Sequence, residues 1–268
     1  MSSKIIMAMA LTLLAGMSTG IGGLLAMFQK KNSSRFLSVS LGFSAGVMIY
    51  LSFVEIIPES VEYLLLSYNP VKAHTLQVIS FFFGMFVIAL IDRFVPAGDN
   101  PHEIPNVTTL ASKEEVYQKR LLRTGILSAI AITVHNIPEG LATFTSYMAD
   151  PQIGISIAVA IAIHNIPEGI AVAVPIYFAT GKRFKSFFIA LVSGLSEMVG
   201  ALLGLLLFTV TNTDLTLGFI LAATAGVMIY ISFDELLPTA EAYGEHHLAL
   251  YGVLSGMAVM AVSLILLG

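Results

Sequence analysis

Two segments with the same sequence, HNIPEG, carry the side chains best suited to chemistry in this chain. They begin at His135 and His164. Because residues three and four apart share one face of a helix, each copy projects a histidine, an asparagine and a glutamate to one side. The six residues are His135, Asn136, Glu139, His164, Asn165 and Glu168. Imidazole nitrogen with carboxylate and amide oxygen suits Zn, Fe(II), Mn, Co or Cd better than Cu(I).

Both segments lie deep within long apolar stretches. His135 lies thirteen residues before the end of the stretch 121–148, and His164 lies twelve after the start of 152–179. At about 1.5 Å rise per residue, both lie roughly 20 Å from the same surface, near mid-membrane. An ionised side chain there costs at least about 2.5–3.5 kcal/mol, and no Lys or Arg is predicted inside these spans. A bound cation is the expected counter-charge, and a metal-free polar network between two helices is the alternative.

Other acidic residues and one methionine extend the candidate site. Glu197 is expected near mid-depth, where metal ligation is favoured over a helix-packing hydrogen bond. Glu55 lies towards the outer end of one span, and Asp234 and Glu235 lie towards the inner end of another. Such acidic groups at the two mouths would concentrate divalent cations. For the acidic residues that follow them, ordinary hydrated helix ends are the alternative; these are Glu59, Glu62, Glu241 and Glu245. For Met48, packing is favoured over thioether ligation from the residues alone.

The composition identifies the class of protein that must position these groups. Of 268 residues, 56% are apolar and 11% charged, whereas a soluble domain carries about 25% charged residues. This excludes a soluble enzyme, a disordered chain and a nucleic-acid binder, which would need a basic surface. The absence of cysteine excludes thiolate metal sites and thiol nucleophiles.

Eight stretches are long enough to cross a bilayer as helices, which takes about 20 residues each. They are too continuous to be barrel strands. The stretches are roughly 5–28, 36–57, 76–95, 121–148, 152–179, 186–209, 215–238 and 247–267. The sequence therefore predicts an all-α membrane protein, a single transmembrane domain over 1–268 that lies in the lipid bilayer.

The basic residues predict how the chain is oriented. Eleven lie on the side of the loops that follow spans one, three, five and seven, against Lys4 and Lys72 on the other side. Since cytoplasmic loops are rich in Lys and Arg, we expect the first side to face the cytoplasm and both termini to lie outside. The eleven are Lys30, Lys31, Arg35, Arg93, Lys113, Lys119, Arg120, Arg123, Lys182, Arg183 and Lys185. The connection 96–120 is predicted to be a flexible cytoplasmic loop.

Two internal similarities predict an inverted repeat. Residues 45–58 read AGVMIYLSFVEIIP and residues 225–238 read AGVMIYISFDELLP, an offset of 180, while the HNIPEG copies are offset by 29. Within each pair, one copy is on an even-numbered span and the other on an odd-numbered span, so the copies cross the membrane in opposite directions. This predicts a 3+2+3 arrangement of spans about an axis in the membrane plane, as in many transporters. A structural duplication without transport is the alternative.

The doubled HNIPEG, the segment SGLSEMVG at 193–200 and the eight-span plan with an external N-terminus resemble the ZIP family of metal transporters, and most closely its bacterial members. The resemblance runs from the first span to the last. It implies a binuclear site at mid-membrane with the two HNIPEG glutamates bridging. The first position takes His135, Glu139, His164, Glu168 and Met48, and the second takes Asn136, Glu139, Asn165, Glu168 and Glu197.

The resemblance also implies uptake of zinc, often with iron, manganese, cobalt or cadmium, across the cytoplasmic (inner) cell membrane. It further implies a homodimer and an elevator-like movement of spans one, four, five and six. We therefore expect a divalent-metal transporter, without a catalytic cofactor, rather than an enzyme. An intramembrane metallohydrolase, for which no HExxH segment is present, and a metal-selective channel are the alternatives.

Overall fold

The computed structural model describes residues 2–28, 33–94, 113–207, 213–242 and 246–267. All elements found in these ranges are helices, which confirms the predicted all-α class. They are α1 (Ser2–Met27), α2 (Ser34–Leu51), η1 (Ser52–Ile56), α3 (Ile57–Leu65), α4 (Pro70–Phe94), α5 (Lys113–Ala149), α6 (Pro151–Thr180), α7 (Arg183–Gly194), α8 (Glu197–Leu207), α9 (Thr213–Ile231), η2 (Ser232–Leu236), α10 (Leu237–Ala242) and α11 (His246–Leu267). Here η denotes a π-helix.

Eight of the described helical segments are long and apolar enough to cross a membrane, as predicted. The second span is longer than expected, because α2, η1 and α3 form one continuous segment over Ser34–Leu65. The sixth is interrupted by a turn at Leu195 and Ser196. Of the predicted loop 96–120, residues 96–112 lie outside the described residues, and residues 113–120 form the first turns of α5.

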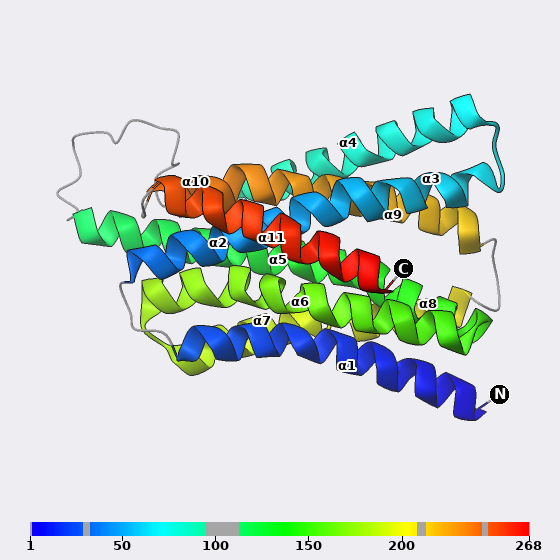
Figure 1. Ribbon diagram of the computed structural model, residues 1–268, viewed down its shortest axis with the longest axis horizontal. Coiled ribbons are helices and arrows are strands. Elements are labelled where there is room, and N and C mark those ends of the chain that lie inside the picture. Colours follow the sequence, from blue (N-terminus) through cyan, green and yellow to red (C-terminus); the bar gives the residue numbers. More distant parts are fainter. Residues whose placement is uncertain (1, 29–32, 95–112, 208–212, 243–245, 268) are drawn as a thin grey trace.

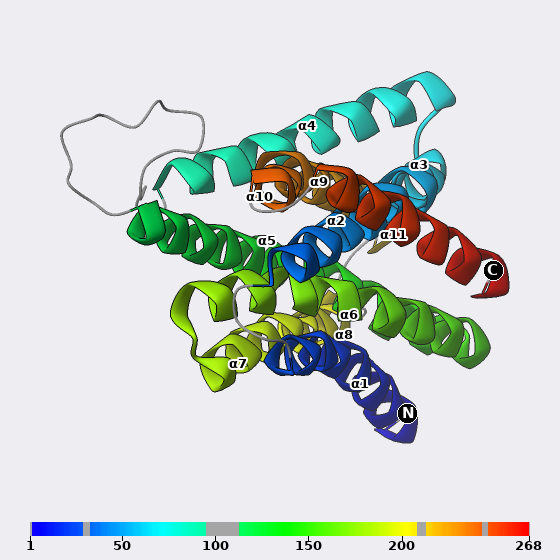
Figure 2. The same cartoon turned by 60° about the vertical axis from the view of Figure 1, so that its left-hand side comes forward.

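The helices form two groups that lie side by side (Figures 1 and 2). One group contains α1, α5, α6, α7 and α8, and the other contains α2, α3, α4, α9, α10 and α11. The groups meet where α2 contacts α6 and where α5 contacts α9. Both chain ends lie towards the same end of the molecule, as an even number of spans requires (Figure 1).

Local signals in the sequence define the hairpin that holds the two HNIPEG copies. The Asp150 side chain caps α6 by accepting a hydrogen bond from the backbone N–H of Gln152 at 2.8 Å, and Pro151 takes the first helical position, where its missing donor costs nothing. Gly181 ends α6 with φ 69°, a left-handed conformation that favours glycine. The hairpin places α5 and α6 against each other in opposite directions.

The two copies of the 14-residue repeat fold in the same way. Each contains a π-helix at the corresponding place, Ser52–Ile56 and Ser232–Leu236. The copies also contact each other reciprocally: Ser52 Oγ lies 3.5 Å from Met228 Sδ, and Ser232 Oγ lies 3.8 Å from Met48 Sδ. This is the relationship that an inverted repeat predicts for these segments; the complete 3+2+3 division stays a prediction.

Candidate metal centre

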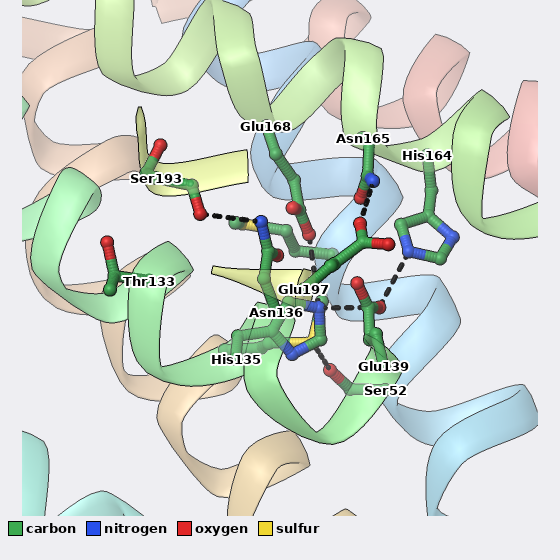
Figure 3. Close-up of polar contacts among 12 residues, drawn as sticks. Ser52, Thr133, His135, Asn136, Glu139, His164, Asn165, Glu168, Ser193 and Glu197 are labelled. Carbon is green, nitrogen blue, oxygen red and sulfur yellow. Dashed lines mark hydrogen bonds and ion pairs between the residues drawn. The ribbon is translucent and has the colours of Figure 1, made fainter. Parts of the chain in front are cut away.

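The two histidines and two glutamates of the HNIPEG segments meet between α5 and α6 (Figure 3). Glu139 Oε1 lies 2.8 Å from His135 Nε2 and 2.7 Å from His164 Nε2. Glu168 Oε1 lies 3.2 Å from His135 Nε2. One ligand atom from each of the four residues lies within 4.8 Å of the other three. Each side chain is buried, with an exposed fraction of 6% or less.

The asparagines of the two segments connect the cluster to neighbouring helices. Asn165 Nδ2 donates to Glu197 Oε1 at 2.5 Å and to the carbonyl of Ala15 at 3.0 Å. Asn136 Nδ2 donates to the carbonyl of Ser193 at 3.1 Å. In both asparagines the amide nitrogen is therefore held by hydrogen bonds, which leaves the amide oxygen available as a ligand.

Glu197 reaches this site because α5 and α8 approach each other at backbone distance. A Cβ atom on Gly140 would clash with the carbonyl oxygen of Glu197, and one on Gly200 would clash with the carbonyl oxygen of Ile137. Such small residues allow membrane helices to pack closely. Glycine at these two positions thus brings the first residue of α8 next to the HNIPEG helices.

Several oxygen atoms of the site have no hydrogen-bond donor among the described residues. They are Asn136 Oδ1, Glu139 Oε2, Asn165 Oδ1, Glu168 Oε2 and Glu197 Oε2. A buried polar atom without a partner costs free energy, and unpaired carboxylate oxygens repel each other. A divalent cation would satisfy these atoms together. The donors are imidazole nitrogen with carboxylate and amide oxygen, which can hold zinc and other borderline or hard divalent ions.

A cavity of about 150 Å³ borders the cluster. It extends towards the end of the molecule that holds the termini, because its lining includes Met260 and Leu264 of the second half of α11. Its polar lining consists of Glu55, Glu59, His135, Glu139, His164 and Thr224. The volume is enough for a few water molecules. The structure thus brings Glu55 to the path that reaches the cluster, together with Glu59, one turn further along the second span.

Asp234 and Glu235 lie apart from the cluster, in a second acidic group with Asp92 of α4. Glu235 is buried and accepts a hydrogen bond from Thr124 Oγ1 at 3.0 Å. Arg123 Nη2 lies 2.6 Å from Asp92 Oδ1, and its Nη1 lies 4.0 Å from Glu235 Oε1. The expectation that no Lys or Arg lies inside the HNIPEG spans is therefore wrong. The Arg123 side chain is 11% exposed within α5, although it pairs with the second acidic group rather than with the cluster.

Met48 lies at the contact between the two repeat copies. It is buried, and its sulfur lies 3.8 Å from Ser232 Oγ. The sequence did not predict that Arg123, Thr124 and Asp92 lie beside Asp234 and Glu235. The one usable signal was that Arg123 lies within a turn of the predicted membrane boundary at residue 121.

Comparison with known proteins gives matches along nearly the whole chain. The sequence model of the family described as ZIP Zinc transporter matches residues 1–92 and 97–264. A relative from Chlorobaculum parvum, called Zinc transporter ZupT, is 53% identical over 266 residues, which cover 99% of each chain. Relatives with the same name from Clostridium perfringens and Lysinibacillus sphaericus are 51% identical over 276 residues (98% of this chain and 97% of the relative) and 50% identical over 268 residues (100% of both).

Proposed function

Because this chain belongs to the ZIP family of transporters, we propose that it carries zinc into the cytoplasm through the buried site between α5 and α6. It is a multi-pass membrane protein, and its relatives are named as zinc transporters, not enzymes. This membership decides against the intramembrane metallohydrolase. The names of the relatives support zinc as the cargo, and the positions of this chain's own side chains support the route.

The observation that carries the proposal is the cluster of His135, Glu139, His164 and Glu168. Two imidazoles and two carboxylates converge within 4.8 Å, deep in apolar helices, where a divalent cation would neutralise the glutamates. Zinc is bound by His nitrogen and carboxylate oxygen at about 2.0–2.2 Å. Small movements of these side chains would bring all four ligand atoms to that distance from one ion.

We propose that the site holds two ions, with Glu139 and Glu168 bridging. Supporting this, Asn165 bonds Glu197 next to the glutamate pair (Figure 3). Asn136 Oδ1, Asn165 Oδ1 and Glu197 Oε2 are buried oxygens without a hydrogen-bond donor among the described residues, and they could serve a second ion. Iron, manganese, cobalt and cadmium are proposed as further cargo, because this donor set selects among divalent ions mainly by geometry and availability.

A carrier is supported over a channel by the difference between the two ends of the path. The cavity reaches the cluster from the end with the termini, while Thr124 bonds Glu235 across the interface between the helix groups at the other end. The reciprocal contacts of the repeat copies also favour two related conformations, as alternating access requires. A carrier predicts saturable flux and uphill accumulation.

The distribution of basic residues supports a proposal for the membrane and for the orientation of the chain in it. We propose the cytoplasmic membrane, with both termini outside. The described basic residues of the predicted inner side lie at or near the starts of α2, α5 and α7 and the end of α4, and these helix ends lie opposite the end of the molecule that holds the termini (Figure 1). In this proposed orientation, the cavity opens on the external face. The homodimer implied by the resemblance stays a prediction, which mass measurement of the purified protein in detergent would check.

Uptake by proteoliposomes tests the proposal. The double variant Glu139→Ala, Glu168→Ala should abolish uptake of radiolabelled zinc, while Glu62→Ala, on an exposed side chain of α3, should leave it unchanged. Equal recovery of the variants in the vesicles is required for the comparison. Unchanged uptake by the double variant would refute the site.

A further inference from the structure

We propose that Arg123 is the resident cation of the second acidic group, and that it closes the transport path at the end opposite the cavity until the arriving metal ion replaces it. The inference rests on the proposed transport function. It adds a positioning residue that belongs neither to the HNIPEG segments nor to the cluster.

The first step of the argument is the position of Arg123 between two acidic side chains. Its guanidinium contacts Asp92 at 2.6 Å and lies 4.0 Å from Glu235. The side chains of these three residues are 11%, 17% and 4% exposed. When one partner of an ion pair that is largely removed from water is deleted, the folded protein is strongly destabilised, because the remaining charge is left uncompensated. The acidic residues therefore hold Arg123 in this position, and Arg123 compensates their negative charge.

The second step is that these contacts join the two helix groups. Arg123 and Thr124 belong to α5, in the group that contains the HNIPEG hairpin. Their partners belong to the other group: Asp92 on α4, Glu235 on η2, and Thr239 on α10, whose hydroxyl lies 3.0 Å from that of Thr124. The interface is thus closed by polar contacts at the end opposite the cavity. An opening of the two groups at this end must break them.

The third step is that a metal ion can replace the arginine. Asp92, Asp234 and Glu235 offer carboxylate oxygens within 4.8 Å of one another, and Glu235 Oε1 has no hydrogen-bond donor among the described residues. A divalent cation that leaves the cluster brings more charge than a guanidinium and favours the same oxygens. When it binds there, Arg123 loses its partners, and the closed contact between the groups is no longer held. Metal arrival and opening are thereby coupled.

The chain contains no cysteine, so single engineered thiols report accessibility without background. Ser128, one turn from Thr124 on α5, is fully buried, and we expect Ser128→Cys to react slowly with a membrane-impermeant thiol reagent from either face. In the double variant Ser128→Cys, Arg123→Gln, the labelling rate of the thiol from the face opposite the cavity should rise roughly tenfold, since a hydrogen bond between charged groups is lost. Labelling of Ala142→Cys, which reports on the cavity, should fall, because the two ends open alternately.

The controls separate closure from general damage. Arg183→Gln removes a cation from the same end, where Arg183 contacts Tyr177, and should leave both labelling rates unchanged. Asp92→Asn breaks the same ion pair from the other side and should reproduce the effect of Arg123→Gln. The exchanged pair Asp92→Arg, Arg123→Asp should restore slow labelling of Ser128→Cys, which loss of folding could not do.

Zinc added to the protein with Arg123 intact should also speed labelling of Ser128→Cys, because the ion replaces the arginine. If neither Arg123→Gln nor Asp92→Asn changes labelling in folded protein, Arg123 does not hold the closure, and the inference is wrong. The labelling experiments without metal do not depend on transport. If the proposed transport function is wrong, this would show separately, because the proteoliposomes would take up no zinc.

Discussion

Glu139 of α5 and His164 of α6 contact each other at 2.7 Å between Oε1 and Nε2. The two residues are 25 positions apart in the chain and lie on helices that run in opposite directions. The same carboxylate oxygen also contacts His135, one turn back on its own helix. Glu139 therefore connects the two HNIPEG copies, and it should have the largest single effect on metal binding.

Replacement of Glu139 by glutamine should weaken zinc binding by at least about 100-fold. Loss of a group that only hydrogen-bonds a metal ligand already costs about 10–100-fold in metal affinity. Glu139→Gln removes a charged ligand that both proposed ions share. Isothermal titration of the purified protein in detergent measures the effect. Glu62→Gln, on an exposed side chain, is the matched control. Equal affinity in both variants would contradict the central place of Glu139.

Zinc binding should weaken as the pH falls. Histidine binds metal as the neutral imidazole, so protons and zinc compete for His135 and His164, and binding releases protons. The apparent Kd should therefore rise with each further fall in pH. Titrations in buffers of different ionisation enthalpy measure the released protons directly. A Kd that stays constant from about pH 8 to pH 5 would exclude imidazole ligands.

The sequence allowed the eight spans and the meeting of the HNIPEG copies to be predicted because both depend on local rules. Span length follows from apolar continuity, and the shared face of His135 and Glu139 follows from helical geometry. The break at Leu195 and Ser196 and the π-helices could not be predicted, since they depend on packing between distant segments. The same holds for Arg123, whose acidic partners lie 31 and 112 residues away in the chain.

Gly140→Ala should displace Glu197 and destabilise the protein by about 1–3 kcal/mol, the usual cost of overpacking. The added methyl group meets the backbone carbonyl of Glu197, which cannot move unless α8 shifts. Gly20→Ala is the matched control, because its methyl group meets the end of the Leu191 side chain, which can rotate. Thermal unfolding and the zinc stoichiometry measure the two consequences. Similar losses of stability and of bound zinc in both variants would show that the backbone contact at Gly140 has no special role.

Met48 and Met228 occupy equivalent places in the repeat, and this makes each the control for the other. Both sulfurs lie near a serine hydroxyl of the opposite copy, but the resemblance to the ZIP family gives a ligand role to Met48 alone. Leucine keeps most of the volume and removes the sulfur, so packing changes little in either variant.

If Met48 binds the ion, Met48→Leu should lower cadmium affinity several-fold more than zinc affinity, because a thioether is a soft ligand. Met228→Leu should leave the ratio of the two affinities unchanged. Competition titrations with cadmium and zinc on both variants measure the ratio. The same ratio in Met48→Leu as in the parent protein would show that Met48 acts in packing between the repeat copies, with the metal held by the nitrogen and oxygen ligands of α5, α6 and α8.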